Sequence, residues 1–349
     1  MTLSAHVRLP LLEEQSGHLV AVSPRVVART NGGPRTVRLS LTDRCDLACV
    51  YCRPPGKESF LDDSLGEAAF EAMIDGLFAA GVRRFRITGG EPLLHRNVVA
   101  RVASIARRNP DDLALTTNGT RLADLAQPLR DAGLGRITVS MDSARPDVFA
   151  RLTRGGRLDR VLAGIAAARL ADFPERKLNV VVVRGENDDE LPALVELAWS
   201  AGMTPRFIEI MPVGEGATLG PDALVSAKEM RAKLAGLIDD EPWYTDTDRG
   251  PARYVAARRD PSLRVGFITG TTDTFCEGCD RLRVAADGFV RACLAREDGE
   301  PAADHARSGD AVGVAGAIAE AWARKPDGVV WRGCTEDSAR AVSMRAVGG

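Results

Sequence analysis

The sequence predicts an α/β fold in which a partial (βα)6 TIM-like barrel is followed by a smaller C-terminal α+β region. Strand-like and helix-like segments alternate six times between residues 36 and 210, as in parallel sheets with right-handed crossovers. Five sequences follow directly after strands, at the end where βα barrels carry active sites: TDRC, TGGEP, TTNG, VSMDS and EIMPVG. Six units are too few for a complete eight-stranded barrel, and a doubly wound sheet is the alternative.

The six strands are predicted from short apolar or alternating runs. They are expected at residues 36–41, 83–88, 113–117, 136–141, 178–184 and 205–210. The first helix is predicted over 66–80, where apolar residues recur at helical spacing from Phe70 to Phe78, and Gly81 ends it. Residues 1–33 show no sustained periodicity, so we expect a loosely ordered extension ahead of a barrel over 34–245.

The C-terminal region, which we assign to residues 246–349, is predicted to be rich in strands. Strands are expected at 263–268, 282–285 and 289–292. The last two are separated by Asp287-Gly288, a dipeptide typical of a tight β-hairpin turn. A helix is predicted over 311–322.

Composition narrows the class of protein. A chain of 349 residues is long enough for one large domain and a smaller one. The net charge of -2 argues against nucleic acid or a membrane surface as a general partner. The N-terminus lacks the continuous apolar core of a signal peptide, and no apolar run is long enough to span a bilayer. We therefore expect a cytoplasmic enzyme.

Six of the seven cysteines fall into two trios. Cys45, Cys49 and Cys52 have C-x₃-C-x₂-C spacing directly after the first predicted strand. Iron–sulfur clusters held by protein alone usually take four cysteines, so three leave one iron open to a small-molecule ligand. A structural zinc site would need a fourth ligand nearby, and a disulfide framework belongs to small secreted chains. An iron–sulfur cluster is therefore the favoured interpretation.

The second trio consists of Cys276, Cys279 and Cys293, in C-x₂-C-x₁₃-C spacing. With the first trio present, a second cluster with an open iron is favoured over zinc, for which His305 would be the nearest fourth ligand. Arg281 and Arg283 lie two residues apart on a predicted strand, hence on one face. Paired guanidinium groups suit a polyphosphate. Cys334 is left over and is interpreted as a buried or incidental thiol.

The first trio, followed by Gly89-Gly90-Glu91-Pro92, resembles the signature of radical S-adenosylmethionine (SAM) enzymes. The order of RLSLTDRCDLACVYC, TGGEP, TTNG, RFIEIMPVG, FCEGCDRLR and a terminal Gly-Gly is similar to the GTP 3′,8-cyclase family of molybdenum-cofactor biosynthesis. The resemblance covers residues 36–349. It implies a radical SAM lyase that converts GTP to (8S)-3′,8-cyclo-7,8-dihydroguanosine 5′-triphosphate.

The resemblance also implies roles for particular residues. It implies two 4Fe–4S clusters on the two trios, with GTP bound at the second. The residues implied to contact SAM are Tyr51, Gly90, Ser140 and Met211. Those implied to contact GTP are Arg38, Arg86, Thr117, Lys177, Arg206, Arg281 and Arg283. Arg281, Arg283, Gly348 and Gly349 are implied to take part in catalysis, with the terminal glycines threading into the site.

Partners are implied in the same way: a reductant of the flavodoxin or ferredoxin type, cyclic pyranopterin monophosphate synthase acting downstream, and a second copy of the chain in a homodimer. Arg84 and Arg53 depart from the family pattern, which usually has Lys and Met there. Two other functions are alternatives to this one. Another radical SAM enzyme with an auxiliary cluster, such as a peptide-modifying enzyme, usually carries more C-terminal cysteines. A non-catalytic zinc-binding interaction module would be colourless.

Overall fold

The structure is a computed structural model that describes residues 33–56, 60–61, 65–239, 244–245, 250–276, 279–326 and 344. Its strands form one mixed sheet of 12 strands in the order β12-β11-β10-β1-β2-β3-β4-β5-β6-β9-β8-β7. The eight strands from β10 to β9 in this order run parallel to one another. The general prediction of an α/β fold is confirmed.

Six of the parallel strands come from the predicted alternation. They are β1 (Thr36–Ser40), β2 (Arg84–Thr88), β3 (Asp112–Thr117), β4 (Arg136–Ser140), β5 (Glu175–Val182) and β6 (Thr204–Glu209). The other two, β9 (Arg264–Ile268) and β10 (Arg281–Val284), come from the C-terminal part and join opposite edges of the six. The parallel part of the sheet therefore combines the six predicted strands with two strands from the C-terminal region.

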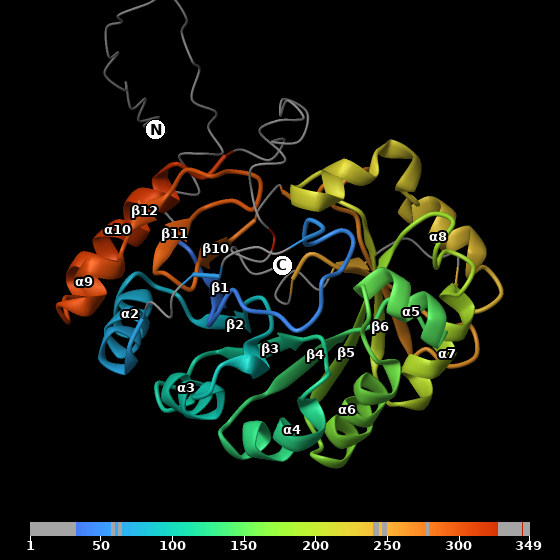
Figure 1. Ribbon diagram of the computed structural model, residues 1–349, viewed down its shortest axis with the longest axis horizontal. Coiled ribbons are helices and arrows are strands. Elements are labelled where there is room, and N and C mark those ends of the chain that lie inside the picture. The colour runs from blue at the N-terminus through green and yellow to red at the C-terminus, as the bar shows by residue number, and fades with distance from the viewer. Residues whose placement is uncertain are drawn as a thin grey trace, which may run out of the picture.

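Helices lie along the outer side of the curved sheet (Figure 1). They are α2 (Glu67–Ala79), α3 (Val98–Ala106), α4 (Leu122–Asp131), α5 (Pro146–Thr153), α6 (Leu158–Leu170), α7 (Leu191–Ser200), α8 (Ala227–Lys233), α9 (Ala303–Arg307) and α10 (Ala311–Ala323). Short 3₁₀ helices occur at η1 (Pro92–Leu94), η2 (Gly214–Leu219) and η3 (Pro221–Ala223). Apolar strand side chains such as Val37, Phe85 and Phe207 are fully buried in the core that these helices cover.

The hairpin predicted around Gly288 is confirmed: β10 pairs antiparallel with β11 (Phe289–Arg291), and Gly288 has a φ of 82°, a conformation that favours glycine. β12 (Glu300–Pro301) continues this edge. At the other edge lie β8 (Arg253–Ala256) and β7 (Tyr244–Thr245), which the apolar pattern did not predict.

Helix α10 fixes the C-terminal part of the chain against the first helix of the alternation. A Cβ atom added to Gly76 in α2 would lie 2.3 Å from Cγ1 of Val314 in α10, far inside van der Waals contact. The two helices therefore approach closely where Gly76 has no side chain. In Figure 1, α9 and α10 lie beside α2.

Strand β5 begins three residues earlier than predicted, at Glu175. Its first residues, ERK, are charged, and the sequence pattern offered no apolar signal there. In the structure Lys177 is buried while Leu178 and Val180 belong to the helix-covered core. Glu175 and Lys177 form an ion pair of 2.6 Å on the face opposite to that of Leu178, whereas Arg176 donates to the carbonyl of Phe173 at 2.8 Å. No described helix is long and apolar enough to cross a membrane.

Candidate active site

The first cysteine trio lies on the loop after β1, which is anchored to the end of α5. The backbone N–H of Ala48 donates to the carbonyl of Thr153 (3.2 Å), and that of Val50 donates to Leu152 (2.9 Å). Cys49 accepts from Cys52 through backbone atoms at 2.9 Å, which forms a tight turn. The loop is therefore held in place independently of any ligand.

The Gly-Gly-Glu-Pro sequence packs directly on this loop. A Cβ atom on Gly90 would lie 2.4 Å from the carbonyl oxygen of Arg44, so only glycine permits this approach. The backbone N–H of Gly90 donates to Thr42 (2.7 Å) and that of Glu91 donates to Arg44 (2.7 Å). The sequence suggested that these glycines allow close contact with a ligand, and the structure adds that Gly90 also allows close contact with the cysteine loop.

Glu91 connects the loop to the end of β3. Its buried carboxylate accepts from Thr117 Oγ1 (2.7 Å) and from the backbone N–H of Asn118 (2.6 Å). Burial is the main influence on Glu91 and raises its pKa to about 7. The hydroxyl of Thr117 also accepts from the backbone N–H of Gly119 (3.0 Å). Thr117 therefore contributes to the architecture of this edge as well as being a candidate ligand contact.

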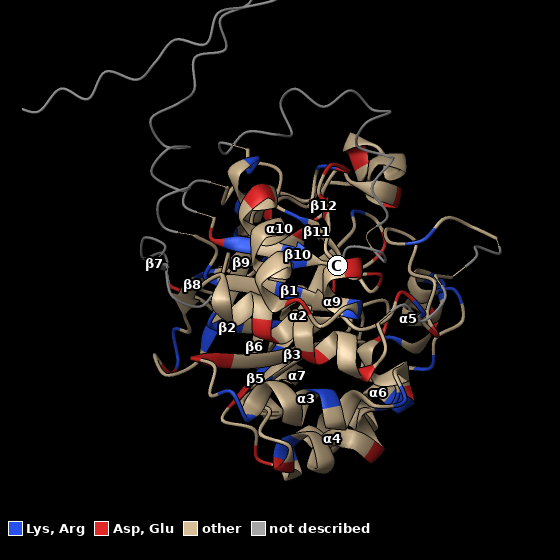
Figure 2. Ribbon diagram, turned by 90° about the vertical axis from the view of Figure 1, so that its left-hand side faces the viewer, with Lys and Arg blue, Asp and Glu red and all other residues tan. Residues whose placement is uncertain are grey.

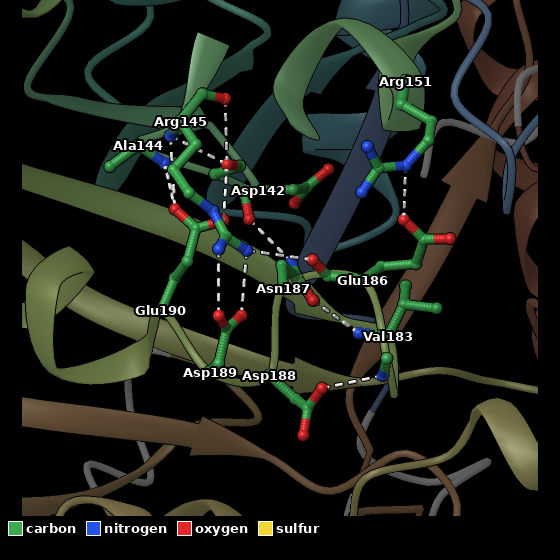
Figure 3. Close-up of polar contacts among 12 residues, drawn as sticks. Asp142, Ala144, Arg145, Arg151, Val183, Glu186, Asn187, Asp188, Asp189 and Glu190 are labelled. Carbon is green, nitrogen blue, oxygen red and sulfur yellow. Dashed lines mark hydrogen bonds and ion pairs between the residues drawn. The ribbon is translucent and has the colours of Figure 1, made fainter. Parts of the chain in front are cut away.

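Tyr51 is joined to the end of β4 by a buried hydrogen bond. Its hydroxyl donates to Oδ2 of Asp142 at 2.6 Å, and Oδ1 of Asp142 accepts from the backbone N–H of Val181 at 2.8 Å. Asn187 donates its side-chain N–H groups to the carbonyls of Asp142 (2.6 Å) and Val181 (2.9 Å). The loops after β4 and β5 are thereby fastened together, as Figure 3 shows.

A second connection between the same two loops supports this arrangement. The buried carboxylate of Glu190 accepts from Ser143 Oγ (2.6 Å) and from the backbone N–H of Ala144 (2.9 Å). Arg145 pairs with Asp189 through two contacts of 2.9 Å (Figure 3). Asp142 therefore sits on a rigid support, and the sequence analysis did not single it out although it lies inside the VSMDS motif.

The thiols of the first trio are half-buried and close enough to influence one another. Burial raises the pKa of Cys45 to about 12 and raises that of Cys49 well above its ordinary value. Nearby carboxylates, including Glu91 and Asp142, act in the same direction. A bound metal centre would reverse this preference, because it deprotonates a coordinating thiol. The donor set thus fits a positively charged metal centre.

Three arginines lie side by side on neighbouring parallel strands. Arg38 on β1 is in register with Arg283 on β10 and with Arg86 on β2. Basic residues recur along this part of the sheet in Figure 2. Burial, followed by the charges of Arg283 and Arg281, holds the pKa of Arg38 well below its ordinary value. The row is a concentrated positive charge suited to an anion with several negative groups.

The basic region continues across the sheet to β5 and β6. The ammonium group of Lys177 lies 2.6 Å from Glu175, and burial together with Arg206 lowers its pKa to about 8. Nη2 of Arg206 donates to Thr138 Oγ1 at 3.3 Å. Lys177 also lies 5.8 Å from the ring centre of Tyr254.

The second cysteine trio lies beside this basic region. Cys276 follows β9, Cys279 precedes β10 and Cys293 follows β11, and the three thiols influence one another electrostatically. Nε of Arg281 donates to Sγ of Cys279 at 3.2 Å. Burial alone would raise the pKa of Cys279, but Arg281 and Lys325 lower it to about 7. Both cations therefore favour the thiolate form of Cys279, which is the form that binds a metal.

The six cysteines of the two trios are all free thiols. Within the described residues, no group of three or more His, Cys, Asp or Glu is already arranged to hold a metal ion. Three cysteines in each trio match the number of protein ligands expected for a cluster with one open iron, whereas a structural zinc site takes four ligands.

Met211 and Ser140 lie at the same ends of their strands as the cysteine loop. Ser140 is the last residue of β4 and is in register with Asn179 on β5. Met211 follows β6 and packs in a small apolar cluster with Val213, Leu294 and Met344. Met344 was not anticipated in this cluster. Gly348, Gly349 and Cys334 lie outside the described residues.

Both departures from the family pattern have partners in the structure. Nη1 of Arg53 donates to the carbonyls of Cys45 (3.5 Å) and Leu47 (3.3 Å), and so braces the loop of the first trio. Arg84 lies 3.8 Å from Asp280, the residue after Cys279.

Comparison with known proteins identifies the family of this chain. Residues 39–198 match the radical SAM superfamily, and residues 203–331 match the family "Molybdenum Cofactor Synthesis C". The chain is 42% identical to the GTP 3′,8-cyclase of Rhodopseudomonas palustris (strain TIE-1) over 301 residues, which cover 84% of this chain and 86% of that protein. It is 41% identical to GTP 3′,8-cyclase 1 of Pseudomonas aeruginosa over 269 residues, 75% of this chain and 80% of that protein. The chain belongs to the GTP 3′,8-cyclase family.

This membership confirms the resemblance drawn from the motifs. As a radical SAM family member, the protein is an enzyme that uses SAM and an iron–sulfur cluster. Among solved structures, Streptococcus suis SuiB bound to precursor peptide SuiA has a TM-score of 0.62 at 13% identity, covering 93% of this chain and 81% of that chain. At this identity the likeness concerns the fold alone.

Proposed function

We propose that this GTP 3′,8-cyclase family member converts GTP to (8S)-3′,8-cyclo-7,8-dihydroguanosine 5′-triphosphate, the first step of molybdenum-cofactor biosynthesis. The observation that carries the proposal is the row formed by Arg283, Arg38 and Arg86, which lies between the segments that bear the two cysteine trios. The triphosphate of GTP is a polyanion, and guanidinium groups bind phosphate oxygens through paired, charged hydrogen bonds.

The first trio is proposed to hold a 4Fe–4S cluster, which would supply the electron for the reductive cleavage of SAM. The proposed SAM contacts Gly90, Ser140 and Met211 lie at or just after the ends of β2, β4 and β6, and Asp142 holds Tyr51 in place. The overall change consumes GTP, SAM, two electrons and one proton. It yields the cyclised triphosphate, methionine and 5′-deoxyadenosine.

The second trio is proposed to hold a second 4Fe–4S cluster, whose open iron would bind the guanine. Arg281 and Arg283, on the strand that follows Cys279, would then lie next to both the cluster and the triphosphate. The remaining proposed GTP contacts are Arg38, Arg86, Thr117, Lys177 and Arg206. The packing of Met344 beside Met211 supports a tail that delivers Gly348 and Gly349 toward this site.

The wider setting is also a proposal. We propose that the sheet acts as a partial (βα)6 barrel over residues 34–245, with 246–349 as the cluster- and GTP-binding part and 1–33 as an extension. The two electrons would come from a cytoplasmic flavodoxin- or ferredoxin-type donor. The product would pass to cyclic pyranopterin monophosphate synthase, and the enzyme would work as a homodimer.

The second candidate is the alternative from the sequence analysis, a radical SAM enzyme that modifies peptides. The arginine row favours the nucleotide, because a triphosphate offers these guanidinium groups several charged oxygens whereas a peptide backbone is neutral. Substrate preference therefore separates the two candidates.

The proposal is tested by incubating the anaerobically reconstituted protein with SAM, dithionite and either GTP or ATP. We expect a product that has the mass of GTP but a different retention time, and no such product from ATP. Arg283→Met should raise the KM for GTP by about tenfold or more, since a charged hydrogen bond contributes roughly 1.5–3 kcal/mol. Arg160→Met, at an exposed position on α6, is the control. The proposal would be contradicted if ATP were turned over as fast as GTP. It would also be contradicted if the protein with its clusters did not turn over GTP.

A further inference from the structure

Lys325 is a buried lysine that none of the proposed roles uses. It lies two residues after the end of α10 and is 5% exposed. Lysine is rarely buried to this degree unless its charge is compensated, because desolvating an ammonium group is costly. Its surroundings should therefore contain a partner of opposite charge.

The ammonium group of Lys325 connects both arms of the hairpin that carries the second trio. Nζ donates to the carbonyl of Arg281 at 2.7 Å and to that of Ala292 at 2.6 Å. Arg281 lies two residues after Cys279, and Ala292 directly precedes Cys293. The ladder between β10 and β11 pairs Arg283 with Arg291, so Lys325 joins the two arms beyond that pair.

The same ammonium group faces the thiols. Burial lowers the pKa of Lys325 while Cys279 and Cys293 act to raise it, and Lys325 in turn lowers the pKa of Cys279. On its other side lies the ring of Trp322, whose centre is 5.0 Å from Nζ. Two backbone carbonyls are neutral, and neutral donors could satisfy them equally well. The need for a full charge therefore comes from the sulfur ligands.

We propose that Lys325 is the fixed counter-charge of the cluster on Cys276, Cys279 and Cys293, where it raises the cluster's reduction potential while holding the two ligand-bearing segments together. This inference rests on the proposed second cluster. One-electron reduction adds negative charge to a cluster, and a nearby buried cation stabilises the reduced form. Lys325 is a positioning residue here, because it touches the ligands and not the substrate.

The test uses the full chain with alanine at Cys45, Cys49 and Cys52, so that only the second cluster is reconstituted and titrated. In this background Lys325→Met and Lys325→Gln should shift the ratio of reduced to oxidised cluster at least tenfold at a fixed potential. That shift corresponds to a potential about 59 mV lower for a one-electron couple. Lys325→Gln keeps a hydrogen-bond donor but removes the charge, which separates charge from simple packing. Lys325→Arg should keep most of the parent potential.

Arg324→Met is the matched control, because Arg324 is the adjacent cation but is 52% exposed and pairs with Glu300. It should leave the potential unchanged. Potentials for Lys325→Met and Lys325→Gln equal to that of the parent would overturn the role of Lys325 while leaving the second cluster intact. Failure of the parent itself to bind four irons would overturn the second cluster, and this inference with it. If Lys325→Met loses iron but Lys325→Gln does not, the potential of Lys325→Gln is the value that tests the role of Lys325.

Discussion

The hydroxyl of Tyr51 donates a 2.6 Å hydrogen bond to the buried carboxylate of Asp142 and so joins the first cysteine loop to the end of β4. The two residues are far apart in the sequence, but the loops that carry them meet at the same end of the sheet. Asp142 is in turn held by the backbone of Val181 and by Asn187. The position of the cysteine loop is therefore coupled to the loops after β4 and β5.

Removing the hydroxyl should destabilise the protein. We expect Tyr51→Phe to lower the free energy of unfolding of the cluster-free protein by roughly 1.5–3 kcal/mol, as for a hydrogen bond to a charged group. Denaturant unfolding of Tyr51→Phe, Asp142→Asn and the double variant gives the coupling between the two side chains. Strictly additive losses would show that the bond contributes nothing of its own.

The affinity for GTP should fall at alkaline pH because of Lys177. Burial and Arg206 lower its pKa to about 8 in the free protein, and a bound triphosphate would stabilise the charged form. Binding above this pH must therefore take up a proton, and the Kd should rise by up to about tenfold per pH unit. Calorimetric titrations between about pH 7 and pH 9.5 measure this. Lys177→Arg, which stays charged, should give a flatter profile, and identical profiles would rule out Lys177 as the cause.

Glu209 should be essential for the loop that leads to Cys276. Its buried carboxylate accepts from the backbone N–H groups of Thr271 (3.0 Å) and Thr272 (2.9 Å) and from Thr272 Oγ1 (2.5 Å). Glu209→Gln places an amide N–H₂ group against these donors and should cost about 2–3 kcal/mol in denaturant unfolding.

The matched control for Glu209 is Glu196→Gln, which breaks an exposed ion pair with Arg259 at 2.8 Å. Such surface pairs contribute roughly 0–1 kcal/mol. A loss for Glu209→Gln no larger than that of this control would show that the carboxylate does not anchor the loop.

The sequence predicted the alternating strands well because each is a short local run of apolar residues that is buried under helices. It did not predict that β9 and β10 would join opposite edges of the sheet, since long-range pairing leaves no local pattern. The early start of β5 was missed because its first three residues, Glu175 to Lys177, are charged and give no apolar signal. No signal in the sequence indicated Lys325, because its role depends on contacts with Arg281 and Ala292, which lie far from it in the sequence.

The two cysteine trios should be separable by substitution. We expect Cys45→Ala to abolish the reductive cleavage of SAM, while Cys276→Ala keeps slow cleavage but forms no cyclised GTP product. Iron analysis should fall from about eight to about four per chain in each variant, as expected for one of two 4Fe–4S clusters. An unchanged iron content in Cys276→Ala would contradict the second cluster.

The most direct measurement is the fate of the hydrogen at C3′ of GTP. Anaerobic protein with both clusters is incubated with SAM, a reductant and GTP deuterated at C3′, and the mass of the released 5′-deoxyadenosine is read. We predict that one deuterium appears in the 5′-deoxyadenosine, because the radical abstracts this hydrogen before C3′ attacks C8 of guanine. If 5′-deoxyadenosine forms without deuterium, SAM is cleaved but the hydrogen or the substrate is another one, and the proposed cyclisation is wrong.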